Sequence, residues 1–410
     1  MGQRLTSLDV LRGMAIAGMI LANNPGSWAF VYPPLLHAEW HGFTPTDWVF
    51  PAFLFISGTA MAFSLAKYQK PSSEIPPFPR EPMNEIPPFP RGARGDNAPQ
   101  SPTPSVYWQL GRRCLVLFLL GLFLNGLSIF LTGFPNFDFS QIRILGVLQR
   151  ISLAYFVGAI AVLNLKRRGL WIFSALVLLV YWAVMTLIPV PGFGAGNLSP
   201  EGNVAAYIDR LILTTDHLYL QGQFDPEGLL STVPAVITLI LGYLTGDWLR
   251  QQKPPENPPQ MLSAPSLGLV QFGLMGIVSG ALWGVIFPIN KQLWTSSYVL
   301  YSAGWTLLIF ALCYELIEVR KIRRWSFPFQ VMGLNALFVF VASGVIVRIL
   351  YRTKIGTGEN AVSTYAWLYK NLFEPWAGSW NGSLFFAIAN LLIWWLILYL
   401  MYRQRWFIKL

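Results

Sequence analysis

The polar stretch between the first two apolar runs of this 410-residue sequence is dense in residues that could do chemistry. It contains Asn23, His37, Trp40 and His41, and it ends at Asp47, where the next apolar run begins. An imidazole titrates near neutral pH, with a pKa of about 6.5, so it can exchange a proton with a substrate. This composition favours a catalytic or binding segment. The alternative is that these residues cap helices and anchor aromatic rings at a membrane surface, with Asp47 as an N-cap.

A second group of candidates is cationic. Arg143 and Arg150 are seven residues apart in what we expect to be one helix, so they should share a face, about 10 Å apart along its axis. A guanidinium in hydrocarbon is costly and normally faces a polar cavity, a partner or an anionic ligand. Arg112, Arg113 and Lys291 are further candidates for binding an anion. The alternatives are a structural ion pair for Arg150, topogenic charge for Arg112 and Arg113, and interfacial anchoring for Lys291.

The elements that position these residues follow from composition. Hydrophobic residues make up 54% of the chain and charged residues only 12%, which is too little polar surface to cover a water-soluble globule. A helix needs about 20 apolar residues to cross a bilayer. We therefore expect an all-α, polytopic membrane bundle of about ten transmembrane helices. The apolar runs are 5–21, 47–65, 107–129, 142–163, 170–188, 229–249, 267–287, 297–317, 327–350 and 384–402.

The distribution of positive charge predicts the orientation of these helices. Lys and Arg are concentrated in alternate loops, starting with the N-terminal one, so both termini are expected in the cytoplasm. The formal charge of +10 therefore indicates membrane topology and not a nucleic-acid partner. The outer loops are then 22–46, 189–228 and 351–382, and they contain all three histidines. The chemistry is expected at the outer face.

The rest of the chain suggests one domain, residues 1–410, interrupted by two cytoplasmic proline-rich linkers at 69–105 and 251–265. The first linker repeats the sequence EIPPFPR at 74–80 and 85–91. This proline density is typical of extended or disordered backbone, either as a flexible insertion or as a motif for a partner.

Several motifs along the chain together resemble the heparan-α-glucosaminide N-acetyltransferase family, in the same order and over nearly the whole length. The resemblance includes the polar stretch that begins at Asn23. The other motifs are LDVLRG (8–13), HAEWHG (37–42), DWVFP (47–51), ILGVLQR (144–150), FDPEG (224–228), NKQLWTSSY (290–298) and GLNA (333–336).

The resemblance implies an enzyme that transfers acetyl from cytosolic acetyl-CoA to a glucosamine amine across the membrane, with no metal. The sequence looks like a bacterial member of the family, without the lumenal domain of the animal enzyme. This implies a location in a bacterial plasma membrane, and the family resemblance also implies a possible homodimer. Matched residue by residue, the family's active-site histidine is His37, its neighbouring asparagine is Asn23, and its acidic residue is Asp47. The stretch from Asn23 to His37 is longer here than in the animal enzyme.

These assignments agree with elementary chemistry. Aminolysis of a thioester needs a base, for which His37 is the candidate, acting directly or through an acetyl-histidine. Asp47 would orient the imidazole, and Asn23 would donate to the oxyanion. The five cations above would bind acetyl-CoA, and the substrate-binding candidates are Trp40, His41, Asp216 and His217.

Two other classes of function stay open. The intramembrane arginines and glycine-rich helices would also suit a secondary transporter of an anionic solute. No internal repeat between the two halves of the sequence supports that class. An O-acyltransferase acting on a cell-envelope glycan is the other alternative.

Overall fold

The computed structural model describes residues 5–68, 104–131, 139–219, 222–252, 261–358 and 361–408. In these residues nearly all regular structure is helical, and the strands form two short antiparallel hairpins. The first pairs β1 (Pro189–Val190) with β2 (Gly194–Ala195), and the second pairs β3 (Lys354–Ile355) with β4 (Val362–Ser363). The EIPPFPR repeat, with most of the two expected proline-rich linkers, lies outside the described residues.

All ten apolar runs are helical, and two shorter helices, α6 and α12, lie between them. The long helices on the first half of the chain are α1 (Thr6–Asn23), α2 (Val49–Ser64), α3 (Pro104–Phe130), α4 (Val147–Asn164), α5 (Arg167–Leu187) and α7 (Leu229–Arg250). The remaining helices are α6 (Val204–Leu213), α8 (Ala264–Gly284), α9 (Ser296–Tyr314), α10 (Phe327–Leu334), α11 (Ala336–Arg352), α12 (Thr364–Leu372) and α13 (Glu374–Arg403).

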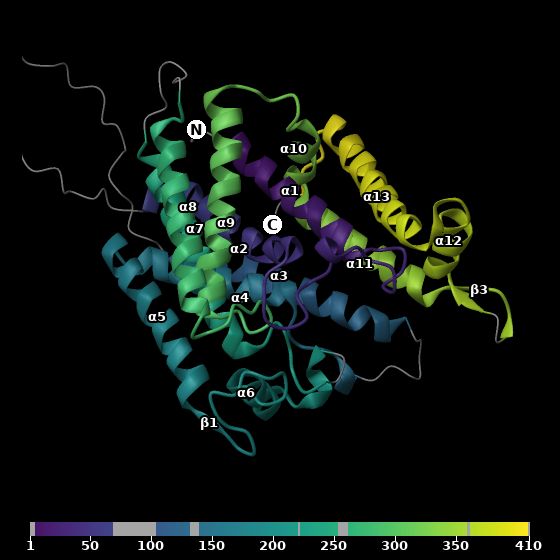
Figure 1. Cartoon of the computed structure of the whole chain (residues 1–410). Helices are drawn as coiled ribbons and strands as arrows, with labels where there is room; N and C mark the ends of the chain where they lie inside the picture. The colour runs from purple at the N-terminus through teal and green to yellow at the C-terminus, as the bar shows by residue number, and fades with distance from the viewer. Residues whose placement is uncertain are drawn as a thin grey trace, which may run out of the picture.

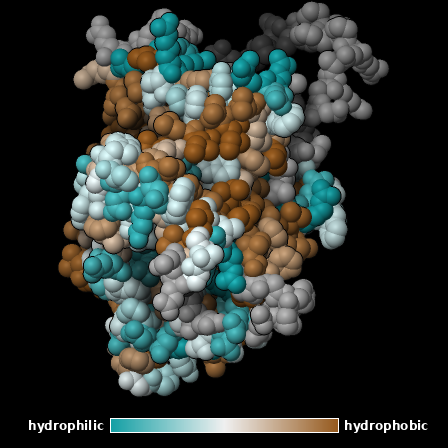
Figure 2. All heavy atoms as spheres, turned by 90° about the vertical axis from the view of Figure 1, so that its right-hand side faces the viewer, coloured by the Kyte–Doolittle hydropathy of each residue, from teal (hydrophilic) through white to brown (hydrophobic). Residues whose placement is uncertain are grey.

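The described helices confirm an all-α, polytopic membrane protein. Eight of them are long and apolar enough to cross a membrane, and the bent pair of α10 and α11 makes a ninth. The tenth run, α1, is as long but less apolar, since it carries Asp9 and Arg12. Only 17% of α8 is buried inside the protein, against 72% of α2 and α7, so α8 faces lipid and the other two lie inside. Apolar residues cover much of the upper and middle part of the face in Figure 2, and polar residues gather at its top and bottom and in smaller patches at mid-height.

Two expectations about helix boundaries were wrong. The run 327–350 is not one straight helix, because the chain bends by 78° between α10 and α11. At the break, the amide of Asn335 donates to the carbonyl of Trp406 (2.9 Å) and accepts from the N–H of Ile408 (3.0 Å), so the C-terminal segment is tied there. Arg143 precedes α4, which begins only at Val147, so Arg143 and Arg150 do not share a helical face.

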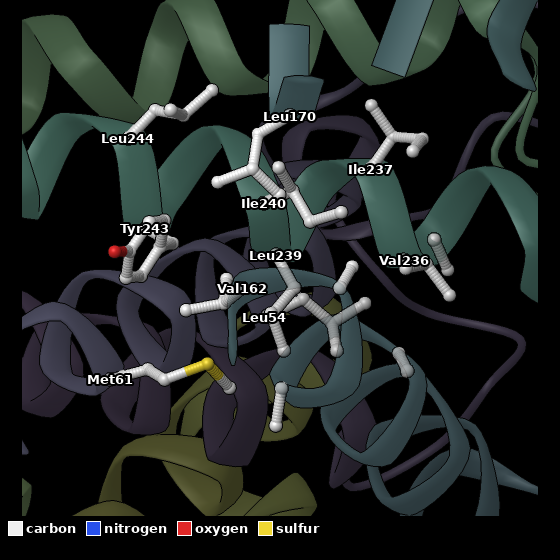
Figure 3. Packing of buried hydrophobic residues seen from close by; sticks show 14 of the residues in the cluster. Leu54, Met61, Val162, Leu170, Val236, Ile237, Leu239, Ile240, Tyr243 and Leu244 are labelled. Atoms are coloured by element: carbon white, nitrogen blue, oxygen red, sulfur yellow. The ribbon is translucent and has the colours of Figure 1, made fainter. Parts of the chain in front are cut away.

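The centre of the bundle is the packing of α2 against α7, with α4 and α5 alongside (Figure 1). Leu54 of α2, Val162 of α4 and Leu239 of α7 meet in one buried cluster (Figure 3). Glycines let the two backbones touch: a Cβ on Gly58 would lie 1.8 Å from the carbonyl oxygen of Leu239. Small residues at such crossings are typical of helices in membranes. The position of α2 is therefore closely fixed, which matters because α2 forms a wall of the site.

Candidate active site

One face of α2 lines a cavity of about 870 Å³. The lining residues recur at helical spacing from Thr46, in the helical turn Pro45–Trp48 that leads into α2, through Phe50, Phe53 and Ser57 to Ser64 at its end. At 1.5 Å per residue these eighteen steps cover about 27 Å, close to the roughly 30 Å of a bilayer core. The cavity therefore extends over most of a membrane's apolar thickness.

A second wall of the cavity is contributed by α1, which packs against α2 and also lines the cavity with one helical face. Arg12, Ile16, Met19 and Asn23 line the cavity from one end of α1 to the other. Arg12 also forms an ion pair with Asp9, one helical turn away, at 3.2 Å. The cavity thus has two distinct ends, one near Arg12 and the other near Asn23.

His37 and Asp47 meet at the second end. The Nδ1 atom of His37 lies 2.7 Å from an oxygen of Asp47, and the Asp47 carboxylate is only 1% exposed. Because this carboxylate accepts the Nδ1 proton, the tautomer with a free lone pair on Nε2 is favoured. The imidazole side chain is 42% exposed and lines the cavity, so it is both oriented and accessible.

The Asp47 carboxylate is held in place by its other oxygen, which accepts from the backbone N–H groups of Ala38 (3.0 Å) and Thr44 (3.1 Å). With Thr44 it forms a capping box at the start of the α2 segment. The N-cap residue is Thr44 and not Asp47, which is instead the third residue of this turn and caps it through its carboxylate. This capping role does not exclude a role at the imidazole. One oxygen caps the helix and the other contacts His37.

Lys291 also lies at this end. Its ammonium is 3.3 Å from the Asp47 oxygen, 2.9 Å from Nδ1 of His37 and 3.3 Å from Nε2. Burial lowers the pKa of Lys291, and the charge of Asp47 opposes that shift. We expected Lys291 among the cations that bind acetyl-CoA. The structure places it against the imidazole.

Arg150 lies deep in the bundle and is 1% exposed. Its guanidinium donates to the hydroxyl of Thr232 (3.3 Å) and to that of Ser231, and it lies 4.9 Å from the ring centre of Trp294. Its Nη1 is buried without a hydrogen-bond partner, and the residue lines the cavity. In the described residues no carboxylate pairs with it. A buried cation of this kind is suited to an anionic or strongly polar ligand.

Arg143 reaches the same cavity with its charge already balanced. It contacts Asp225 through two nitrogens, at 2.9 and 2.6 Å, and it also contacts Glu227. Its guanidinium lies 4.7 Å from the ring centre of Tyr219. Arg143 is therefore tied to the segment before α7, and it is a weaker anion binder than Arg150.

The first end of the cavity is lined by Arg12 and Arg113. The guanidinium of Arg113 lies 5.4 Å from the ring centre of Tyr155. Arg112 is exposed and does not belong to the cavity lining. Of this neighbouring pair, the structure directs only Arg113 toward the cavity.

The four substrate-binding candidates lie outside the cavity lining. The Trp40 indole donates to the carbonyl of Leu198 (2.8 Å). His41 contacts the amide of Asn290 (3.4 Å), and burial lowers its pKa. His217 contacts the carbonyl of Ile142 (2.8 Å), and Asp216 is exposed.

Some residues that line the cavity were not among the sequence candidates. Arg12 and Glu227 belong to motifs that carried the family resemblance, but we did not predict a role in the site for either of them. Trp294 follows Lys291 closely, and its indole donates to Thr238 (3.1 Å). Ser231 and Thr232, whose hydroxyls accept from Arg150, were not candidates either. The signal that could have identified them is that they are polar residues inside an apolar helix.

The fold and this cavity define a multi-pass membrane protein with a histidine–carboxylate pair near one end of a membrane-length cavity and arginines along it. The family model described as heparan-alpha-glucosaminide N-acetyltransferase, catalytic, matches residues 4–264, and the chain belongs to that family.

Two relatives carry the name heparan-alpha-glucosaminide N-acetyltransferase. The human protein is 27% identical, with 99% of this chain and 60% of the relative aligned. The mouse protein is also 27% identical, with 84% of this chain and 54% of the relative aligned. This chain therefore spans little more than half the length of those proteins. Lys291 lies beyond the segment that the family model matches.

Proposed function

We propose that this protein transfers the acetyl group of cytosolic acetyl-CoA to the amine of a glucosamine-type sugar at the outer face of the membrane. The observation that supports this proposal is the single cavity that contains Arg113 near one end and the His37–Asp47 pair near the other. A donor bound by its phosphates at one face could place its thioester near an acceptor at the other. The family membership supports the same reaction class.

In this mechanism His37 takes a proton from the acceptor amine through Nε2, while Asp47 stabilises the imidazolium that forms. The amine nitrogen bonds to the thioester carbon, the carbon–sulfur bond breaks, and the CoA sulfur takes the proton. Lys291, 3.3 Å from Nε2, is close enough to stabilise the negative oxygen of the tetrahedral intermediate. Asn23 lines the same cavity and is a second donor. In the alternative route, Nε2 attacks the thioester carbon, the carbon–sulfur bond breaks and CoA leaves as its thiol. The amine then attacks the acetyl carbon, the bond to Nε2 breaks, and the imidazole keeps the amine's proton.

The donor would lie along the cavity with its phosphates near Arg113 and Arg12. The length of the cavity suits the extended pantetheine arm, and Arg150 lies on its path. The proposal includes the orientation expected from the charge distribution, with both termini cytoplasmic, and a bacterial plasma membrane. A homodimer is part of the same proposal. The four residues expected to bind the acceptor lie outside the cavity lining, so the proposal does not assign them that role.

The direct test uses inside-out vesicles that contain the purified protein, with acetyl-labelled acetyl-CoA outside and glucosamine inside. We expect labelled N-acetylglucosamine in the lumen. A transporter would move solute without labelling the amine, and an O-acyltransferase would give an ester that mild alkali removes. Either of those results would overturn the proposal.

Changing Lys291 to arginine is expected to move the alkaline limb of the pH–rate profile to higher pH. The lysine has a lowered pKa, so as the pH rises it loses its charge earlier than an exposed lysine would. If the charge stabilises the oxyanion, activity falls as Lys291 deprotonates. A guanidinium stays charged over that range. The measurement is kcat/KM from pH 7 to 10, and an alkaline limb that is the same in both proteins would contradict this role.

A further inference from the structure

A second, smaller cavity of about 240 Å³ opens beside the outer end of the main one. It lies between α1, α3, α4 and α11, and we call it the side chamber. Asn23, Arg143 and Phe340 line both the side chamber and the main cavity. At about 30 Å³ per water, its volume corresponds to about eight waters, the scale of one sugar ring.

The side chamber contains an unbalanced positive charge. Arg348 of α11 donates to the carbonyl of Gly344 one turn earlier (2.9 Å). In the described residues no carboxylate pairs with it, and no Asp or Glu lines the chamber. The other cation of the chamber, Arg143, is balanced by Asp225 and Glu227. A cation inside a transmembrane helix needs an anionic partner or a polar cavity, so Arg348 is available to a ligand.

The rest of the lining is polar as well. Gln149 is 1% exposed, and its amide nitrogen is buried without a hydrogen-bond partner in the structure. Asn24 and Asn125 also line the chamber, and each uses its amide nitrogen on backbone carbonyls. A buried amide donor without a partner is costly unless a ligand or water satisfies it.

We propose that the side chamber is an acceptor subsite that binds an acidic oxygen group, a carboxylate or a phosphate, on the sugar that carries the amine or on its neighbouring residue. Arg348 is the counter-charge and Gln149 the hydrogen-bond donor. Asn23, at the junction of the two cavities, lies where the amine would pass toward His37. The inference rests on the proposed transferase function and narrows its acceptor to acidic amino sugars.

The test compares glucosamine with glucosamine 6-phosphate and a glucosaminyl-uronic acid disaccharide as acceptors for the purified protein. The wild type is expected to prefer at least one acidic acceptor. Arg348→Gln should lower kcat/KM for that acceptor by about tenfold, with the values for glucosamine and for acetyl-CoA unchanged. Arg348→Lys should retain most of the preference. Arg352→Gln, an exposed position one turn further along α11, is the matched control and should change nothing.

Gln149→Leu tests the same subsite at a second residue, so that the conclusion does not depend on the Arg348 variants alone. The Gln149 amide nitrogen donates to no protein group, so its removal breaks no hydrogen bond and folding should be retained. The preference for the acidic acceptor over glucosamine should fall. Equal losses for neutral and acidic acceptors, or no preference in the wild type, would overturn the subsite.

A binding experiment separates the subsite from the transferase proposal. Stabilisation of the protein by glucosamine 6-phosphate without acetyl-CoA should be present in the wild type and absent in Arg348→Gln. If that holds while no acceptor is acetylated, the transferase proposal fails and the anion site stands. If the Arg348-dependent ligand is instead a co-purified acidic lipid, found by mass spectrometry in the wild type only, the acceptor subsite is overturned.

Discussion

Replacing His37 by glutamine is expected to lower the rate of acetyl transfer by about a thousandfold, in the range for loss of a general base. The side chain lies in the cavity with Nδ1 against Asp47 at 2.7 Å, so Nε2, which has the Lys291 ammonium 3.3 Å away, is the atom that would take the substrate's proton. Glutamine keeps similar size and hydrogen bonding but cannot accept a proton from an ammonium or carry an acyl group. The measurement is the initial rate with labelled acetyl-CoA and glucosamine.

His41→Gln is the control for this change. It lies in the same loop but outside the cavity lining, where it contacts Asn290, so its rate should be near that of the wild type. A His37→Gln variant that retains more than about a tenth of the activity would remove the base assignment. In the absence of acceptor, label that appears on wild-type protein but not on His37→Gln would select the acetyl-histidine route.

The fold class could be predicted from the sequence because it depends on the length and apolarity of each run. All ten runs are helical, since a backbone in lipid must satisfy its own hydrogen bonds. The errors occur where a side chain far away in sequence decides the local geometry. The break before α11 is stabilised by Asn335 and the segment at Trp406, and no local pattern shows that pairing.

The arginines show the same limit. Periodicity placed Arg143 and Arg150 on one helical face, but Arg143 lies in extended chain and reaches the cavity through its contacts with Asp225 and Glu227. That pairing links residues about eighty positions apart. Lys291, a weak sequence candidate, lies beside His37 because the loop before α9 meets the loop before α2, where Gly42 donates to the Ile289 carbonyl (2.8 Å).

Residue types were informative where chemistry is local. The family resemblance matched His37 and Asp47 to a histidine and an acidic residue of one site, and the loop that joins them is short. In the structure the Asp47 capping box closes this loop. The sequence could not show which neighbours face the cavity. Arg112 and Arg113 are adjacent, but only Arg113 lines it, and of His37 and His41 only the first does. Such choices depend on helix rotation and loop path, which tertiary packing sets.

Changing Arg150 to methionine is expected to lower kcat/KM for acetyl-CoA by about a hundredfold, with little loss of folding. The Arg150 guanidinium is fully buried, and its Nη1 atom has no hydrogen-bond partner in the protein. We therefore expect Nη1 to bind a group of the ligand in the cavity. Folding should survive because the two hydroxyls that accept from it have another bond. Ser231 and Thr232 both also donate to the carbonyl of Gly228.

Methionine fills similar volume beside Trp294, which is also held by its indole bond to Thr238. Removing a buried cation that lacks a carboxylate partner takes away a desolvation cost, so the melting temperature in detergent should stay the same or rise. Arg150→Lys keeps the charge but loses the planar fork, and it should fall between the wild type and the methionine variant. If the variant instead melts much lower and binds acetyl-CoA normally, Arg150 is a structural residue and the donor's path lies elsewhere.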